Sequence, residues 1–228
     1  MPIVVILFFV FIIGIIIYSK IQADKRRAAL AAYAAQRGLN FSSEDPFDIP
    51  GRLEDFSLMQ SGSSRCASNV FWGTVGGSEI MLFEYQYVTG SGKHRTTHHY
   101  VCCQWRLPVP LASLAVRPEN VLDHVAEWFG HNDIDFESSE FSRRYHVKGD
   151  DKREVYAVFH PRMMEFLMQS DLEYLEVIGD RALTYSDDSS LTPECCEWFL
   201  ALARGFNENL PEHVIREKGG LTDARRSS

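Results

Sequence analysis

The residues from Met1 to Ser19 carry no charged side chain, and the stretch from Ile3 to Tyr18 reads IVVILFFVFIIGIIIY. As a helix this stretch spans about 24 Å at ~1.5 Å per residue, and its flanking residues bring the span close to the ~30 Å hydrocarbon core of a bilayer. A small water-soluble domain cannot bury a helix that is apolar on every side. The stretch therefore predicts a transmembrane helix over residues 1–19. The residues assigned to this membrane anchor are Ile3, Phe8, Phe11, Ile16 and Tyr18.

A basic segment follows the apolar stretch and predicts its orientation. Lys20, Lys25, Arg26 and Arg27 stand against the single acid Asp24, and no cationic side chain precedes the stretch. The positive-inside rule then places the N-terminus outside and the rest of the chain in the cytoplasm, as in a single-pass protein of a bacterial inner membrane. We expect the four cations to form a collar at the lipid headgroups. The whole chain has 23 basic and 31 acidic side chains. Without these five residues, the rest of the chain has 19 basic and 30 acidic side chains and therefore a net charge of −11.

A cleaved secretory signal is the alternative for the N-terminus, and it would release a secreted domain. Such a signal needs a positive n-region, a shorter apolar stretch and a small-x-small cleavage site. Only the α-amino group precedes the apolar stretch, and the sequence from Tyr18 to Ile21 offers no suitable site. The membrane anchor is therefore the favoured interpretation, with the lipid bilayer as a partner.

Composition excludes several classes of protein. The chain has 228 residues, of which 45% are hydrophobic and 12% aromatic, so it has room for one ordinary domain and is not disordered. A net charge of −8 argues against nucleic-acid binding through a basic surface. Cys66 stands alone, and the adjacent pairs Cys102-Cys103 and Cys195-Cys196 suit disulfide geometry poorly. Reduced thiols are expected, although a few long-range pairings stay open.

The rest of the chain predicts an α+β fold, an antiparallel sheet with packed helices. Three β-rich segments, Asn69–Val75, Glu79–Thr89 and Arg95–Leu107, are separated by short glycine-containing turns, which indicates an antiparallel meander. Prolines 108 and 110 are expected to end it. One face of the second segment carries Met81, Phe83, Tyr85 and Tyr87, and one face of the third carries His99, Val101, Cys103, Trp105 and Leu107; we expect these faces to be buried.

Further elements are expected after the meander. In chain order they are a helix at 118–129, a strand at 141–147, a helix at 154–168 interrupted by Pro161, a hairpin of strands 172–178 and 182–185, and a helix from Thr192 to about Asn207. The predicted division of the chain is 1–19 transmembrane helix, 20–38 basic juxtamembrane helix ended by Gly38, 39–64 irregular connector with a possible strand at 55–60, 65–210 α+β domain and 211–228 flexible tail.

The sequence supplies no complete catalytic or cofactor motif. The stretch TGSGKH, from Thr89 to His94, resembles a phosphate-binding loop but lacks the glycine spacing, the Ser or Thr after the lysine and the helix that such a loop opens. It is better explained as a hairpin tip. There is no Gly-x-Ser-x-Gly motif either. We therefore assign no catalytic residue and no cofactor, and an enzymatic activity stays unassigned.

Metal binding is the one chemistry that the residue types suggest. His94, His98, His99, Cys102 and Cys103 lie within ten residues, and zinc favours His and Cys. In a strand, however, His98 and Cys102 lie about 13 Å apart at ~3.3 Å per residue, too far to share one tetrahedral ion. His94 and His98 could only join ligands from elsewhere in the fold, so no metal is assigned and these two remain weak candidates.

Four segments together carry a resemblance. They are LFEYQYVTGSGKHRTTHHYVCCQWRLP (82–108), VRPEN (116–120), FSRRYHV (141–147) and VFHPRMMEFL (158–167). With its Gly-Ser-Gly-Lys hairpin, Leu-Pro and Arg-Pro-Glu, this set resembles a family of prokaryotic single-pass membrane proteins whose shared domain has no known function. The resemblance covers roughly residues 65–205 and implies a membrane-anchored α+β domain. It supplies no catalytic residues.

These observations favour a membrane-anchored cytoplasmic domain that binds or scaffolds a partner, either another protein or a small ligand near the membrane. The hypothesis rests on the anchor, the charge and the missing catalytic motifs. The alternative is a membrane-tethered enzyme, with or without a metal, that uses the region of His94 and His98. Convergence of those histidines with a carboxylate or a thiol in one pocket would distinguish the two. The sequence does not predict an oligomeric state.

Overall fold

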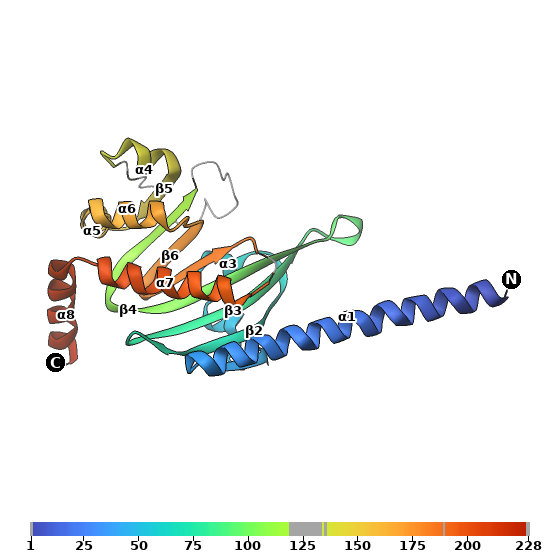
Figure 1. The fold of residues 1–228 in the computed structure, drawn as a ribbon. Coiled ribbons are helices and arrows are strands. Elements are labelled where there is room, and N and C mark those ends of the chain that lie inside the picture. The colour runs from blue at the N-terminus through green and yellow to red at the C-terminus, as the bar shows by residue number, and fades with distance from the viewer. Residues whose placement is uncertain (1, 119–133, 135, 189, 227–228) are drawn as a thin grey trace.

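The structure, a computed structural model, describes residues 2–118, 134, 136–188 and 190–226, and the side chains of these residues except 2–10, 16 and 221–226. Its centre is a six-stranded antiparallel sheet in the order β1-β2-β3-β4-β5, with β6 paired to the other edge of β4 (Figure 1). The expected α+β class, an antiparallel sheet with packed helices, is confirmed. The helix expected at 118–129 lies outside the described residues apart from Pro118.

The meander is formed by β2 (Ser63–Val75), β3 (Ser78–Thr89) and β4 (Thr96–Pro118). Pairs such as Gly73↔Ile80 and Phe83↔Cys102 show that consecutive strands are antiparallel, as predicted. The first half of β4 lies between β3 and β6, and its last residues lie between β5 and β6. The long strand β4 therefore joins the two halves of the sheet.

The prediction that Pro108 and Pro110 end the meander was wrong. The strand β4 continues through both prolines to Pro118, and its pairing with β6 changes register between Arg106 and Leu111. Proline lacks the N–H that a ladder needs, so the irregular register spares the two residues from regular pairing. Both prolines are exposed, while Leu107 and Val109 between them point into the core.

The second predicted hairpin, residues 172–178 and 182–185, is instead one strand, β6 (Tyr174–Ser186). Its two halves pair with successive parts of β4, from Val116↔Leu175 to Val101↔Ser186. Gly179 has a φ of +60° and pairs with Leu111 at the irregular register. The glycine therefore bends the strand together with β4, where the sequence had indicated a reversal.

Both faces of the sheet are buried. Two predicted sets of inward residues lie on opposite faces, because Phe83 pairs with Cys102 whereas Leu82 pairs with Cys103. On one face, Val101, Cys103, Trp105 and Leu107 join a large core, and on the other Met81, Phe83, Tyr85 and Tyr87 join a smaller one. The exception is His99, which is exposed because β4 has passed beyond the covering helices there.

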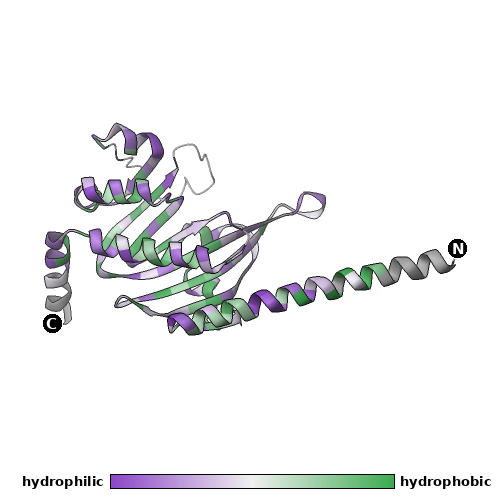
Figure 2. Cartoon of the chain, in the orientation of Figure 1, coloured by the Kyte–Doolittle hydropathy of each residue, from purple (hydrophilic) through white to green (hydrophobic). Residues whose placement is uncertain are grey.

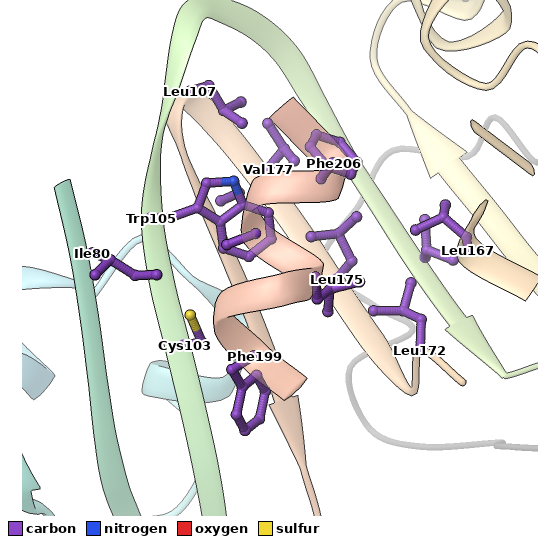
Figure 3. Packing of buried hydrophobic residues seen from close by; sticks show 14 of the residues in the cluster. Ile80, Cys103, Trp105, Leu107, Leu167, Leu172, Leu175, Val177, Phe199 and Phe206 are labelled. Atoms are coloured by element: carbon purple, nitrogen blue, oxygen red, sulfur yellow. The ribbon is translucent and has the colours of Figure 1, made fainter. Parts of the chain in front are cut away.

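The helix α7 (Pro193–Asn209) covers the large-core face. Thr192 caps it by accepting a hydrogen bond from the Cys195 N–H at 3.2 Å, as the sequence predicts. Figure 3 shows Phe199 and Phe206 of this helix pointing to the strand residues Cys103 and Trp105. The Trp105 and Phe206 rings meet edge to face at a centroid distance of 5.8 Å. The predicted apolar stripe therefore packs on the sheet.

The segment 39–64, predicted as an irregular connector, contains three elements: β1 (Asn40–Glu44), α2 (Ile49–Arg52) and α3 (Ser57–Gln60). The first pairs with β2, for example at Phe41↔Phe71. Its Ser-rich sequence resembles a loop, and the edge of β2 supplies the hydrogen bonds that make it a strand. Residues 55–60, predicted as a strand, instead form α3 and cover the small core with α2.

The strand predicted at 141–147 begins only at β5 (Tyr145–Gly149), because residues before it form the helix α4 (Ser139–Arg144). Ser138 caps that helix, and the helix residue Phe141 is fully buried. The interrupted helix at 154–168 is confirmed as α5 (Lys152–Val158) and α6 (Pro161–Gln169), with the second beginning at the proline.

The tail predicted to be flexible at 211–228 contains the helix α8 (Glu212–Arg226). Val214 is buried in the large core, and Lys218 forms an ion pair with the buried carboxylate of Glu154 on α5. The sequence is polar and contains Gly219-Gly220, a pattern typical of frayed ends. Contacts with the body of the domain, which the pattern does not show, hold the helix.

Candidate functional site

A single helix, α1 (Pro2–Arg37), runs from the apolar stretch into the body of the domain (Figure 1). Residues 20–37 are helical and the helix ends at Gly38, as the sequence predicts, since Gly38 has a φ of +68° and the Leu39 N–H donates to the Ala34 carbonyl. This is the left-handed residue that ends many helices. No loop separates the apolar stretch from the domain.

Most of the described side chains in the N-terminal half of α1 are exposed. Phe11 is 67% exposed and Tyr18 is 65% exposed, and Ile13, Ile15 and Ile17 are 54%, 52% and 54% exposed. Figure 2 shows hydrophobic turns on this part of the helix and hydrophilic turns nearer the body. Large apolar side chains that are exposed in series mark a surface for an apolar partner.

Over the described residues, no helix has the length and hydropathy that a membrane span needs. The side chains of the predicted anchor residues Ile3, Phe8 and Ile16 are not among those that the structure describes. The result that no helix meets the requirements of a membrane span therefore does not cover residues 2–10, the first half of the apolar stretch. A transmembrane helix over residues 1–19 stays a proposal.

The C-terminal half of α1 packs on the large core. Leu30 and Ala34 are each 1% exposed, and Tyr33 is buried with them. The Tyr33 ring meets Phe71 of β2 edge to face at 6.1 Å, and its hydroxyl donates to the Glu197 carboxylate of α7 at 2.7 Å. One face of this half is therefore fixed to both the sheet and α7.

Arg26 differs from the other three residues of the predicted collar. It pairs with Glu84 of β3 and donates to the Leu191 carbonyl at 3.3 Å, so it holds the helix on the domain. Burial lowers the pKa of its guanidinium. Lys20 and Lys25 are exposed, and Arg27 lies 3.9 Å from Asp24. Of the four residues predicted as a collar, Lys20, Lys25 and Arg27 are therefore the ones that are exposed.

Glu84 holds α1 on the domain, and the sequence did not single it out. Besides Arg26, its carboxylate accepts hydrogen bonds at 2.7 Å from the Asn69 amide and from the Leu191 N–H. The signal was present in the alternation, since Glu84 follows Ile80 and Leu82 on the face of β3 that is otherwise apolar. A carboxylate at such a position needs partners of this kind.

The weak metal candidates lie on the hairpin that joins β3 to β4, which contains the short 3-10 helix η1 (Gly92–His94). His94 is exposed at its tip, and His98 stacks on Tyr87 at 4.8 Å and hydrogen-bonds Thr89 at 2.8 Å. Over the described residues, no group of three or more His, Cys, Asp or Glu side chains could hold a metal ion. Among the residues that the structure describes, the two histidines do not converge with a carboxylate or a thiol.

The buried thiols of Cys102 and Cys103 and the buried carboxylate of Glu176 have structural roles. All five cysteines are free, and burial raises the pKa of Cys102 and Cys103 well above the ordinary value, which disfavours the nucleophilic thiolate. Burial also raises the pKa of Glu176 to about 7. Its carboxylate accepts the Ser57 hydroxyl at 2.6 Å, and both residues are almost fully buried. This pair therefore fastens α3 to β6.

A cavity of about 530 Å³ lies at the other end of β3, between the β2–β3 turn, β4, α7 and α8. Its volume is in the range of small-molecule and peptide pockets. Asn207 of α7 forms one wall, where it accepts from the Trp105 indole at 3.2 Å and donates to the Ser78 hydroxyl at 2.9 Å. Further lining residues are Ile80, Leu107 and Leu200 on the apolar side and Glu79, Arg106, Arg204 and Glu208 on the charged side.

Comparisons with known proteins identify the fold. No family model matches the chain, and no curated protein matches it. Among solved structures, the fold is similar to the crystal structure of the mycobacterial trehalose monomycolate transport factor A, TtfA. The match has a TM-score of 0.59 at 14% identity and covers 81% of this chain and 93% of that chain. At this identity the likeness shows the fold alone.

Proposed function

We propose that the chain is a single-pass membrane protein whose α+β domain binds or scaffolds another protein at the inner face of a bacterial membrane. The observation that carries this proposal is α1, which joins an exposed apolar stretch to a half that is locked into the domain. An apolar stretch of this kind is stable in a lipid phase and costs free energy in water. The structural neighbour, named as a transport factor, is compatible with a binding or scaffolding role.

The N-terminus lies outside and the domain lies in the cytoplasm, because Lys20, Lys25 and Arg27 follow the apolar stretch. The cavity is the proposed binding site. It lies at the β2–β3 turn, and the strand β3 separates this turn from the β3–β4 hairpin. Its apolar floor and its charges of both signs suit a short amphipathic segment of a partner protein.

The anchor is tested by alkaline extraction of membranes that contain the full-length chain. The double variant Ile13→Arg, Ile17→Arg places two charges on exposed apolar positions of α1, at about 2.5–3.5 kcal/mol each for a membrane-centre arginine. We expect it to move to the soluble fraction. The control Ala28→Arg, Ala32→Arg adds the same charges at the same spacing on exposed positions of the docked half. It should stay in the membrane, and equal behaviour of the two variants would contradict the anchor.

The binding site is tested by photo-crosslinking in cells. A photoreactive residue at Pro108, which is exposed and lines the cavity, should give a discrete adduct with a partner protein. The same residue at the exposed Arg162 of α6, outside the cavity, is the matched control. An adduct pattern that is the same at both positions would argue against the cavity.

A further inference from the structure

The β3–β4 hairpin points the same way as the free half of α1. Three contacts relate α1 and the segment just after it to successive levels of β3. Leu39, two residues beyond the helix, lies against Gly73, which pairs with Ile80, and Tyr33 meets Phe71, which pairs with Leu82. Arg26 then pairs with Glu84. Toward its N-terminus α1 therefore runs in the direction in which β3 runs toward its hairpin, and Figure 1 shows both leaving the body on one side.

The hairpin also reaches far enough to meet the membrane. From the shared level of Arg26 and Glu84, β3 advances about 17 Å to Thr89, at ~3.3 Å per residue. The helix covers only about 12 Å from Arg26 back to Tyr18, at ~1.5 Å per residue. Even if the two elements diverge by about 45°, the strand still advances about 12 Å along the helix direction. The tip beyond Thr89 therefore lies at the level where the apolar stretch ends.

The tip is basic in an acidic protein. From Tyr85 to Pro118 the chain contains no Asp or Glu, although it has 31 acidic residues in all. Lys93, His94 and Arg95 are all exposed at the tip. Within the described part of the chain, neither Lys93 nor Arg95 has an ion-pair partner. These two cations are therefore free to meet an external anion.

The acids that the structure describes near the hairpin lie behind its tip. Ser186, at the end of β6, pairs with Val101, so Asp187 and Asp188 follow at a level well short of Arg95. Glu84 is neutralised by Arg26. Among the described residues, the foremost charges on this side of the domain are therefore positive.

The shape of the tip is also fixed. Gly90 has a φ of +73°, and a Cβ there would lie 2.1 Å from the His94 carbonyl oxygen. Tyr87, Tyr100 and His98 stack at the base, with the Tyr87 ring 5.7 Å from that of Tyr100 and 4.8 Å from that of His98. A tight turn on an aromatic base holds Lys93 and Arg95 forward, which lowers the entropy lost on binding.

We propose that the β3–β4 hairpin is a second membrane contact, in which Lys93 and Arg95 bind the phosphates of anionic lipid headgroups in the leaflet that α1 leaves. This inference rests on the proposed membrane anchor. With the collar of Lys20, Lys25 and Arg27, the hairpin forms a two-point contact that fixes how the domain faces the membrane. The lipid is specified by charge alone, because the site consists of two exposed cations and no enclosed pocket.

The test is hydrogen–deuterium exchange of full-length protein in nanodiscs, followed over peptides that cover residues 88–97. Discs of pure phosphatidylcholine are compared with discs that contain phosphatidylglycerol. We expect slower exchange at the tip only in the anionic discs. Since each cation near an anionic surface contributes about fivefold, the variant Lys93→Gln, Arg95→Gln should lose up to about thirtyfold of that protection. Added inorganic phosphate should not reproduce the protection.

A matched variant removes two other exposed cations, Arg153→Gln, Arg162→Gln, on α5 and α6. It should keep the protection, and both variants should unfold at the wild-type temperature. Equal exchange in the two kinds of disc, or equal loss in both variants, overturns the hairpin contact. Protection by phosphate alone also overturns it in favour of a soluble anion. Co-elution with the discs is checked first: a chain that does not enter them refutes the anchor and the contact together, whereas a chain that enters without protection refutes the contact alone.

Discussion

The two halves of α1 belong to one helix and have opposite surroundings. Phe11 and Tyr18 are 67% and 65% exposed, whereas Leu30 and Ala34 are each 1% exposed. In the docked half, the large apolar residues Leu30 and Tyr33 lie on one face with Ala34, and the exposed positions carry alanine or polar residues, so the domain itself can cover the apolar face. In the free half the apolar residues surround the helix, and no face of one domain could cover them all. The distribution of apolar residues around the helix, rather than its total hydrophobicity, therefore decides which half needs an apolar environment outside the domain.

The largest expected effect is a difference between the two halves of α1 in how much a truncated side chain lowers the stability of the protein. Leu30→Ala removes a fully buried side chain from the docked half, and the free energy of unfolding should fall by about 2–5 kcal/mol. Ile13→Ala, the matched control in the free half, removes an exposed side chain and should change it by less than about 0.5 kcal/mol. Urea unfolding of the full-length protein in detergent, followed by tryptophan fluorescence, measures both. Equal losses would mean that the two halves are not distinct.

The next effect concerns the ion pair at the boundary. Glu84→Gln removes the charge that Arg26, Asn69 and the Leu191 N–H share, and we expect a loss of about 1–3 kcal/mol in the same assay. Asp24→Asn removes the exposed carboxylate that lies 3.9 Å from Arg27, and it should leave the free energy of unfolding nearly unchanged. A neutral result for Glu84→Gln would show that apolar packing alone docks the helix.

A pH effect sharpens the comparison further. Burial, together with the hydrogen bond to Glu197, raises the pKa of Tyr33 above its ordinary 10.0. The folded protein therefore keeps the phenol neutral where the unfolded chain ionises it, so its stabilising contribution is complete below about pH 10 and is lost as the pH rises further. Tyr33→Phe should cost about 0.5–1.5 kcal/mol at neutral pH. The free energy of unfolding of this variant should also fall less steeply than that of wild type between about pH 9 and pH 11. Parallel curves for the two proteins would contradict a buried neutral phenol at Tyr33.

The smallest effect is expected at the surface of the docked half. Arg37 pairs with the exposed carboxylate of Glu197, and such exposed pairs contribute about 0–1 kcal/mol. Arg37→Gln should therefore lower stability by no more than this, and high salt should abolish the difference. A salt-independent loss above that range would place Arg37 among the residues that dock the helix.

The sequence predicts best where a pattern is local. The end of α1 at Gly38, the cap at Thr192 and the break at Pro161 were all confirmed, because each depends on one residue and its immediate neighbours. The meander was found for the same reason, since its short turns leave adjacent strands few other ways to pair.

The errors occur where a distant partner decides. Pro108 and Gly179 each suggested an end or a turn, yet the bend of β4 and the bend of β6 fit each other in one long pair of strands. Asn40–Glu44 is a strand only because β2 offers an edge, and α8 is held by Val214 and by the pairing of Lys218 with Glu154. No local signal carries such information.

The candidate sites show the same division. The basic collar and the exposed hairpin could be predicted, because charge and glycine patterns are local. The inward role of Arg26 and the cavity beside Asn207 could not, since they need segments about sixty and more than a hundred residues apart to meet. Glu84 lies between these cases: its position on an apolar face was visible, and its partners were not.

The unbroken course of α1 has a mechanical consequence. A helix without a hinge acts as a lever, so a change of tilt in its apolar half turns the whole sheet by the same angle. In the proposed anchored state, an apolar stretch of about 24 Å is shorter than the ~30 Å core of a bilayer, and a mismatch of this sign is met by local thinning of the bilayer or by snorkelling of the flanking residues. Any rotation of the helix would carry the cavity with it without a change inside the domain.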